Sequence, residues 1–284
     1  MRHSRTARAI LSLAWLPPTL AAQFEARLDL SASNRYVWHG LSRAAGCVVQ
    51  SSAAAGFRID RFTISTGWVR HHELDQVSPG EITELGVGKG RVGEDDVWVQ
   101  GAFDLGRLQL RSGVVRYVFP GLAPEGGGGP LRKTTEVYAS AGTTSKYLNP
   151  SVEAWWDVGR VRGGFLKASA SSPVIGWPLE PFVFIALTGE AGVNLGQGRD
   201  PARPHDLANF FGRGVTHAGL GLTGVYPLQH WSGVGSASLD FGLNSQLNLD
   251  RATRFNGIGR TSRLMLWLSA GVTLLLGGEA KVLR

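Results

Sequence analysis

A strict alternation of apolar and polar residues constrains the fold of this chain more than any other feature. Across Phe24–Ser33, the even positions carry Phe, Ala or Leu and the odd positions carry Glu, Arg, Asp or Ser. The same pattern returns over Ala237–Leu247. Because successive side chains of a β-strand point to opposite faces, this period predicts strands with one apolar and one polar face. After residue 22, no apolar stretch reaches the ~18 residues of a transmembrane helix.

The alternation and the turn residues divide the chain into twelve strands, many near the ten or so residues that a tilted strand needs to cross a bilayer. Two-residue steps at Asp60-Arg61 and Gly106-Arg107 are typical of tight hairpins. The expected strands are Phe24–Ser33, Val48–Ile59, Phe62–Arg70, Val97–Leu105, Leu108–Val118, Thr134–Thr143, Ser151–Val158, Val161–Ala170, Phe182–Asn194, Val215–Tyr226, Ala237–Leu247 and Arg263–Leu275.

The segment Ile82–Gly90 is a candidate for a further strand. A barrel with both chain ends in the periplasm needs an even strand number, with its long loops mostly on the outside. If Ile82–Gly90 is instead part of one long loop from His71 to Asp96, most of the long loops lie on the extracellular side of the membrane. The loop Val37–Cys47 is one of them. We therefore predict twelve strands, with fourteen as the alternative.

The polar face favours a barrel over a soluble sandwich, because its many Ser, Thr, Gly and Asn residues would pack a sandwich core poorly. Aromatic residues also recur near strand ends, as in Tyr36 and Trp38 after the first strand, or Phe62 and Trp68 on one face of a later strand. Such girdles border the apolar band of membrane barrels, and only closure satisfies every backbone group in lipid. We predict an all-β, antiparallel up-and-down transmembrane β-barrel that forms a single domain over residues 23–284. A soluble periplasmic or secreted β protein is the alternative.

The N-terminus indicates export. Arg2, Arg5 and Arg8 precede the short apolar run Ala9–Leu16, and small residues follow up to Ala22. This order is typical of a secretory signal peptide, so we expect residues 1–22 to be removed and the remainder to reach the bacterial outer membrane.

Charge and cysteine content narrow the choice of partners. The formal net charge is +7, and the three arginines of the expected signal peptide leave +4 on the rest of the chain. That surplus is interleaved with acidic residues, so nucleic acid is not an expected partner. The lone Cys47 excludes a disulfide framework.

Several short motifs resemble the TorF-like family of putative porins. They lie in Ser33–Ser42 with Val48–Gln50, in Tyr117–Gly121 and in Glu136–Tyr138, although His39 stands where the family pattern leads us to expect Arg. The resemblance covers mainly residues 24 to 170. It implies a porin-like outer-membrane barrel of poorly defined function and supplies no catalytic residues. The residues that carry it are Asn34, Tyr36, Trp38, Gly40, Gln50, Pro120, Gly121, Glu136 and Tyr138.

No catalytic, cofactor or metal signature emerges from the sequence, and we do not expect an enzyme. His71-His72 with Glu73 and Asp75 matches no strong metal spacing and is interpreted as a solvated turn. His205-Asp206 is equally weak, and Gly126–Gly129 is interpreted as a flexible loop because no phosphate-binding context follows it. Nothing in the sequence pairs His217 with Ser269 as a hydrolase would require.

The polar faces indicate what the lumen holds. Opposed charges across a narrow interior either line an aqueous passage or pair into a plug. The candidate lumen-lining residues are Glu25, Arg27, Asp29, Arg111 (or Gln109, depending on register), Asp240, Asn244 and Gln246.

These features predict an outer-membrane channel for passive diffusion of small polar or charged solutes, without a cofactor. Its expected partners are outer-membrane lipid, the barrel-assembly machinery and the solutes themselves. The first alternative is a plugged structural or interaction barrel whose extracellular loops bind a partner. A less favoured alternative is an outer-membrane hydrolase acting on lipid or the cell wall.

Overall fold

The structure is a computed structural model that describes residues 24–44, 46–74, 91–119, 132–159, 161–176, 183–197, 210, 213–231, 235–250 and 263–277. The expected signal peptide (residues 1–22) lies outside these residues. The same holds for Asp75, Ile82–Gly90, Pro120-Gly121, Gly126–Gly129 and His205-Asp206. None of the described residues belongs to a helix long and apolar enough to cross a membrane.

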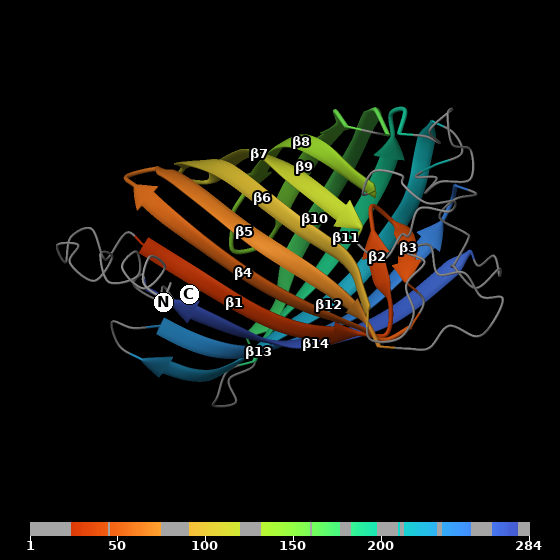
Figure 1. The fold of residues 1–284 in the computed structure, drawn as a ribbon. Helices are drawn as coiled ribbons and strands as arrows, with labels where there is room; N and C mark the ends of the chain where they lie inside the picture. Colours follow the sequence, from red (N-terminus) through yellow and green to blue (C-terminus); the bar gives the residue numbers. More distant parts are fainter. Residues whose placement is uncertain are drawn as a thin grey trace, which may run out of the picture.

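Twelve antiparallel strands close into one barrel, and two short strands form a separate hairpin (Figure 1). The hairpin consists of β2 (Tyr36–Trp38) and β3 (Leu41–Ala44). The barrel strands are β1 (Phe24–Ser33), β4 (Val48–Ile59), β5 (Phe62–Glu73), β6 (Arg91–Leu105), β7 (Leu108–Phe119), β8 (Arg132–Thr143), β9 (Asn149–Asp157), β10 (Gly163–Gly176), β11 (Phe184–Asn194), β12 (Gly214–Trp231), β13 (Gly235–Asn248) and β14 (Leu264–Leu276). The predicted all-β fold with twelve barrel strands is confirmed.

Strand β1 closes the ring, because it pairs with β4 on one side and with β14 on the other. The register is continuous along both seams, with Asp29 opposite Ser52 on one side and Thr273 on the other. Two of the register shifts follow Pro173 and Pro227, whose nitrogens carry no hydrogen to donate to the ladder. The ring therefore leaves no open edge.

The two ends of the barrel differ in their connections. At one end, here called the short-turn end, the turns at 60–61 and 106–107 join neighbouring strands. Asp60 and Gly106 take up the positive φ angles that such tight turns need, +53° and +83°. The other end, here called the long-loop end, carries most of the long connections, including those between β5 and β6 and between β11 and β12.

The outer face of the barrel is apolar all the way round. Leucines and valines on alternate positions of successive strands are about half exposed, including Leu30 (56%), Val99 (54%) and Leu268 (57%). Phe62 and Trp68 share this face, because the register of β5 alternates with the inward residues. A water-facing protein surface rarely carries an apolar area of this extent.

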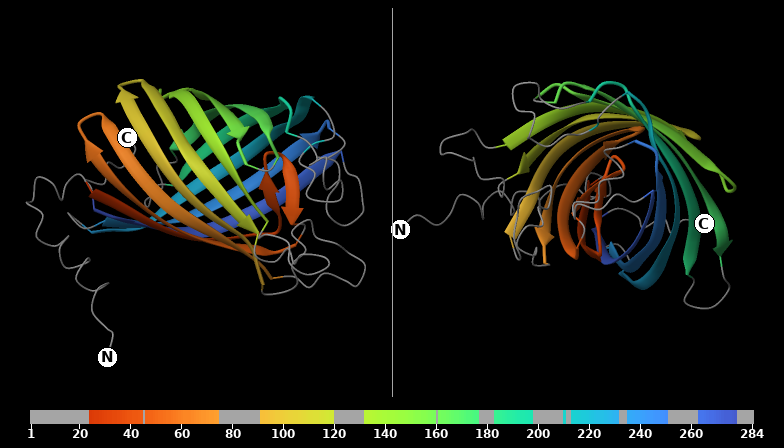
Figure 2. Two further views of the ribbon diagram at one scale, coloured as in Figure 1. Left: turned by 45° about the horizontal axis from the view of Figure 1, so that its top comes forward. Right: turned by 90° about the vertical axis from the view of Figure 1, so that its right-hand side faces the viewer.

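The hairpin β2–β3 corrects one expectation. Val37–Cys47 was expected to be an external loop, and Tyr36 and Trp38 were expected to be part of an outer aromatic girdle. Instead, the hairpin lies inside the ring near the long-loop end (Figure 2). Tyr36 and Leu41 are buried. The physical reason is that the inner wall offers these side chains buried hydrogen-bond and ring partners, whereas alternation shows only which strand face is apolar.

Candidate functional site

The strand register defines the inner face of the barrel. Cross-strand partners share a face, so the residues opposite inward-facing Asp29 can be followed from strand to strand around the ring. This register places all the candidate lumen residues on the inner face: Glu25, Arg27 and Asp29 on β1, Arg111 with Gln109 on β7, and Asp240, Asn244 and Gln246 on β13.

Asp29 is the centre of a polar cluster on the inner wall, near the middle of β1. Its carboxylate accepts hydrogen bonds from Arg27 Nε (2.8 Å), Ser52 Oγ (2.8 Å) and Thr273 Oγ1 (2.7 Å). Thr273 Oγ1 also lies 2.6 Å from the Asp240 carboxylate. The structure therefore brings Arg27, Asp29 and Asp240 together across three strands. Their side chains make this part of the inner wall charged.

The hairpin is bound to one side of the inner wall through a buried carboxylate, Glu136 on β8. Tyr117 Oη donates to Glu136 over 3.0 Å, and His39 Nε2 of the hairpin lies 3.4 Å from the same carboxylate. Gln197 Nε2 donates to its other oxygen over 2.6 Å. Glu136 has no exposed surface. One side chain thus joins the hairpin, the wall and the segment after β11.

Further contacts hold the hairpin on the same side. Trp38 Nε1 lies 3.5 Å from Tyr117 Oη, and the two rings meet edge to face. Tyr36 Oη donates to Glu94 on β6 over 3.2 Å. At the base of the hairpin, Arg35 donates to Ser42 Oγ over 2.9 Å, and burial lowers the pKa of its guanidinium below the ordinary value.

The tip of the hairpin reaches the opposite wall. Gln246 on β13 donates to the carbonyl of Gly40 over 2.7 Å. Gly40 has a φ of +80°, and a Cβ there would overlap the ring of His217 on β12. The His39 ring packs 4.3 Å from that of Phe165 on β10. Only glycine fits this position, since both its backbone angle and its surroundings exclude a side chain.

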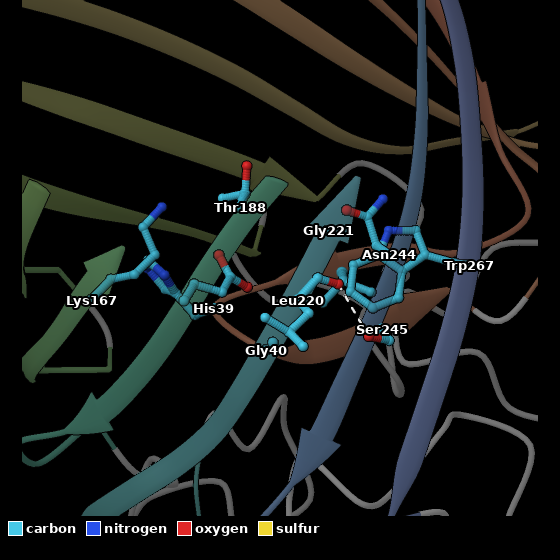
Figure 3. Close-up of a pocket in the computed structure, with 12 residues that line it drawn as sticks. His39, Gly40, Lys167, Thr188, Leu220, Gly221, Asn244, Ser245 and Trp267 are labelled. Carbon is cyan, nitrogen blue, oxygen red and sulfur yellow. Dashed lines mark hydrogen bonds between the residues drawn. The ribbon is translucent and has the colours of Figure 1, made fainter. Parts of the chain in front are cut away.

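A pocket of about 250 Å³ lies between the hairpin and the wall formed by β10–β14 (Figure 3). Lys167 and Glu190 give it opposed charges, and Asn244 adds an amide. Gly219 and Gly221 leave the wall without side chains at two positions, which keeps the space open. The pocket is large enough for a small polar solute, and it offers such a solute a positive charge, a negative charge and an amide for hydrogen bonding.

The remaining candidate residues take different places. Gln50 lies 2.7 Å from His71 Nδ1, Tyr138 Oη donates to Gln100 over 2.7 Å, and Asn34 accepts from the backbone of Leu268. Pro120 and Gly121 lie outside the described residues. His217 and Ser269 are not brought together, because their register partners on β13 are six residues, or roughly 20 Å, apart.

The interpretation of His71-His72 and Glu73 as a solvated turn is wrong. Strand β5 continues to Glu73, and both His71 and Glu73 are buried on the inner face. Glu94 and Asp96 were not among the candidate residues predicted from the sequence. Their spacing of two, in step with Trp98 and Gln100, is the signal that could have placed them on that face.

No family model matches this sequence, and no curated protein matches it. Solved barrels do match its fold. The KdgM porin is 8% identical, with a TM-score of 0.42, over 87% of this chain and 97% of its own. LpxR from Salmonella typhimurium is 10% identical, with a TM-score of 0.49, over 87% and 99%. Outer membrane phospholipase A from Escherichia coli is 10% identical, with a TM-score of 0.42, over 92% and 96%. The likeness concerns the barrel fold only, and a fold does not determine a function.

Proposed function

We propose that this chain is a bacterial outer-membrane barrel through which small polar or charged solutes diffuse passively, and that the β2–β3 hairpin is its constriction. The observation that carries the proposal is the contrast between the two faces of one closed ring. The outer face is apolar, and the inner face holds charged and small polar side chains with open space beside the hairpin.

The outer face supports insertion into a bilayer. Its exposed leucines and valines would be unfavourable in water at about 25 cal/mol per Å² of apolar surface. In hydrocarbon, a closed ring also satisfies the backbone groups of every strand. The signal peptide expected over residues 1–22 would direct such a chain to export.

The inner face supports passage rather than catalysis. The Asp29 cluster and the pocket beside Gly40 lie on the same side of the lumen, and both present polar groups to the interior. Twelve strands give a bore between that of filled eight-stranded barrels and that of open porins. Among the described residues, Ser269 and His217 do not approach each other as an outer-membrane hydrolase would need.

A second candidate is a plugged barrel, and the packing of the hairpin favours it. Leu41, Phe165 and Phe210 form a buried apolar cluster near the long-loop end. If this packing persists in the membrane, the lumen is closed there and the barrel serves as a structural or interaction platform.

Single-channel recording decides between these two functions. We expect the refolded protein, without residues 1–22, to give small discrete conductance steps in a planar bilayer. A matched variant in which a Gly-Ser linker of equal length replaces Tyr36–Ala44 should give several-fold larger steps, because it removes the constriction.

Silence from the wild type together with steps from the linker variant would establish the plugged barrel instead. If both proteins are silent although they are inserted and folded, the channel proposal is wrong.

A further inference from the structure

Three side chains that can bind a metal converge on the inner wall between β5 and β6. His71, Glu94 and Asp96 each place one ligand atom within 4.8 Å of the other two, and all three are buried. They lie outside the pocket beside Gly40 and are not used in the proposed passage of solutes. One imidazole and two carboxylates form a donor set that transition-metal ions accept.

Two atoms of this cluster are buried without a hydrogen-bond partner. His71 is only 4% exposed, and its Nε2 donates to and accepts from no described group. Asp96 Oδ1 is likewise unsatisfied. Leaving a buried polar atom unpaired costs about 1–3 kcal/mol, so two such atoms in one cluster favour a ligand that contacts both.

Gln50 orients the imidazole toward the two acids. Its side-chain amide lies 2.7 Å from His71 Nδ1. This leaves Nε2 directed at Asp96, whose Oδ2 is 3.5 Å away. The oxygen and nitrogen of a Gln amide can exchange places, and with the oxygen toward the ring it accepts the Nδ1 proton. Nε2 then presents a lone pair, as in histidine ligands held by an outer hydrogen bond.

The cluster places two acidic groups beside one imidazole. His71 Nε2 lies 3.5 Å from Asp96, and the ring offsets the charge of a carboxylate only when it is protonated. Two carboxylates this close and this deeply buried repel one another unless a proton or a cation lies between them. A divalent ion would neutralise both.

We propose that His71, Glu94 and Asp96 bind a divalent transition-metal ion of the Zn²⁺ class. Zinc–nitrogen and zinc–oxygen bonds of about 2.0–2.2 Å place neighbouring ligand atoms of a tetrahedral site roughly 3.4 Å apart. The His71–Asp96 separation of 3.5 Å already meets this requirement. Three protein ligands leave a fourth position for water or a solute.

The ion would also bind the wall to the hairpin. Tyr36 Oη donates to Glu94, and the Tyr36 ring lies 4.2 Å from that of His71. An ion held by Glu94 and His71 would fix two of the residues that contact Tyr36. Metal binding is therefore expected to slow the release of the hairpin from β5 and β6, whether the barrel conducts or is plugged.

The test is zinc titration of the refolded barrel by calorimetry, with protein that carries no histidine tag. We expect one Zn²⁺ per chain in the wild type. Asp96→Asn, which preserves the shape of the side chain, and His71→Ala should weaken binding at least tenfold. Gln50→Leu should weaken it about 10–100-fold, because it removes the outer hydrogen bond. His72→Ala is the matched control, since the neighbouring histidine faces the other side of β5, and it should bind as the wild type does.

Folding of each variant is checked by strand content in circular dichroism and by resistance to protease, so that loss of binding is not mistaken for loss of fold. The proposal is overturned if the folded wild type binds no zinc. It is also overturned if His72→Ala and His71→Ala lose affinity equally. Neither result bears on solute passage, which the conductance experiment measures separately.

Discussion

At the scale of single residues, the carboxylate of Glu136 connects three parts of the molecule that are far apart in sequence. It accepts hydrogen bonds from Tyr117 on the wall and from Gln197 after β11, and it lies beside His39 of the hairpin. A fully buried charge is tolerated only when such partners surround it. Glu136 therefore both holds the hairpin inside the barrel and fixes its position against the wall.

We predict that Glu136→Gln lowers the free energy of unfolding by about 1–3 kcal/mol. The new amide NH₂ group would face a buried donor, Tyr117 or Gln197, that now donates to a carboxylate oxygen. Urea unfolding in detergent micelles measures this loss. Glu153→Gln on neighbouring β9 is the matched control, since Glu153 is partly exposed and pairs with Lys167 at 3.1 Å. Its loss should stay below about 1 kcal/mol. Equal losses in the two variants would contradict the connecting role of Glu136.

At the scale of the strand, alternation determines which substitutions a barrel tolerates. Leu187 and Thr188 are neighbours on β11, and Leu187 is 46% exposed on the outer face. Thr188 instead lines the pocket that also holds Glu190. A lysine introduced at position 187 would therefore face lipid, whereas a lysine introduced at position 188 would face the polar lumen.

We predict that Leu187→Lys destabilises the barrel in lipid vesicles by about 2–4 kcal/mol, the cost of a Lys or Arg on the lipid face near the midplane. Thr188→Lys should change stability by less than about 1 kcal/mol, because Glu190 offers a partner. Reversible guanidinium unfolding in vesicles measures both values. If Thr188→Lys were the more damaging change, the assignment of the two faces would be wrong.

The strands could be predicted from sequence because a period of two reports directly on a two-faced sheet. Phe24–Ser33 and Val48–Ile59 match β1 and β4 at both ends. The hairpin could not be predicted, because Tyr36 and Trp38 fit an outer aromatic girdle as well as a buried plug. Only the closed ring shows that Tyr36 meets Glu94 and that Trp38 meets Tyr117 on the inner wall. The His71 cluster was missed because the expected strands ended at Arg70 and began at Val97, which left the paired ends of β5 and β6 among the loops.

At the scale of the whole molecule, an even number of strands brings the start of β1 and the end of β14 to the same end of the barrel. In outer-membrane barrels, short turns face the periplasm and long loops face the outside. The proposed orientation therefore puts the hairpin near the cell exterior.

Cysteine labelling of intact cells tests this orientation, because Cys47 is the only cysteine in the chain and can be replaced by Ser. In that background, Leu74→Cys places a thiol at the long-loop end, where Leu74 is exposed, and Arg107→Cys places one in a two-residue turn at the short-turn end. We predict that a membrane-impermeant maleimide labels Leu74→Cys on intact cells. Arg107→Cys should react only after the outer membrane is permeabilised. The opposite pattern would invert the barrel, and labelling of neither thiol before permeabilisation would argue against its insertion in the outer membrane.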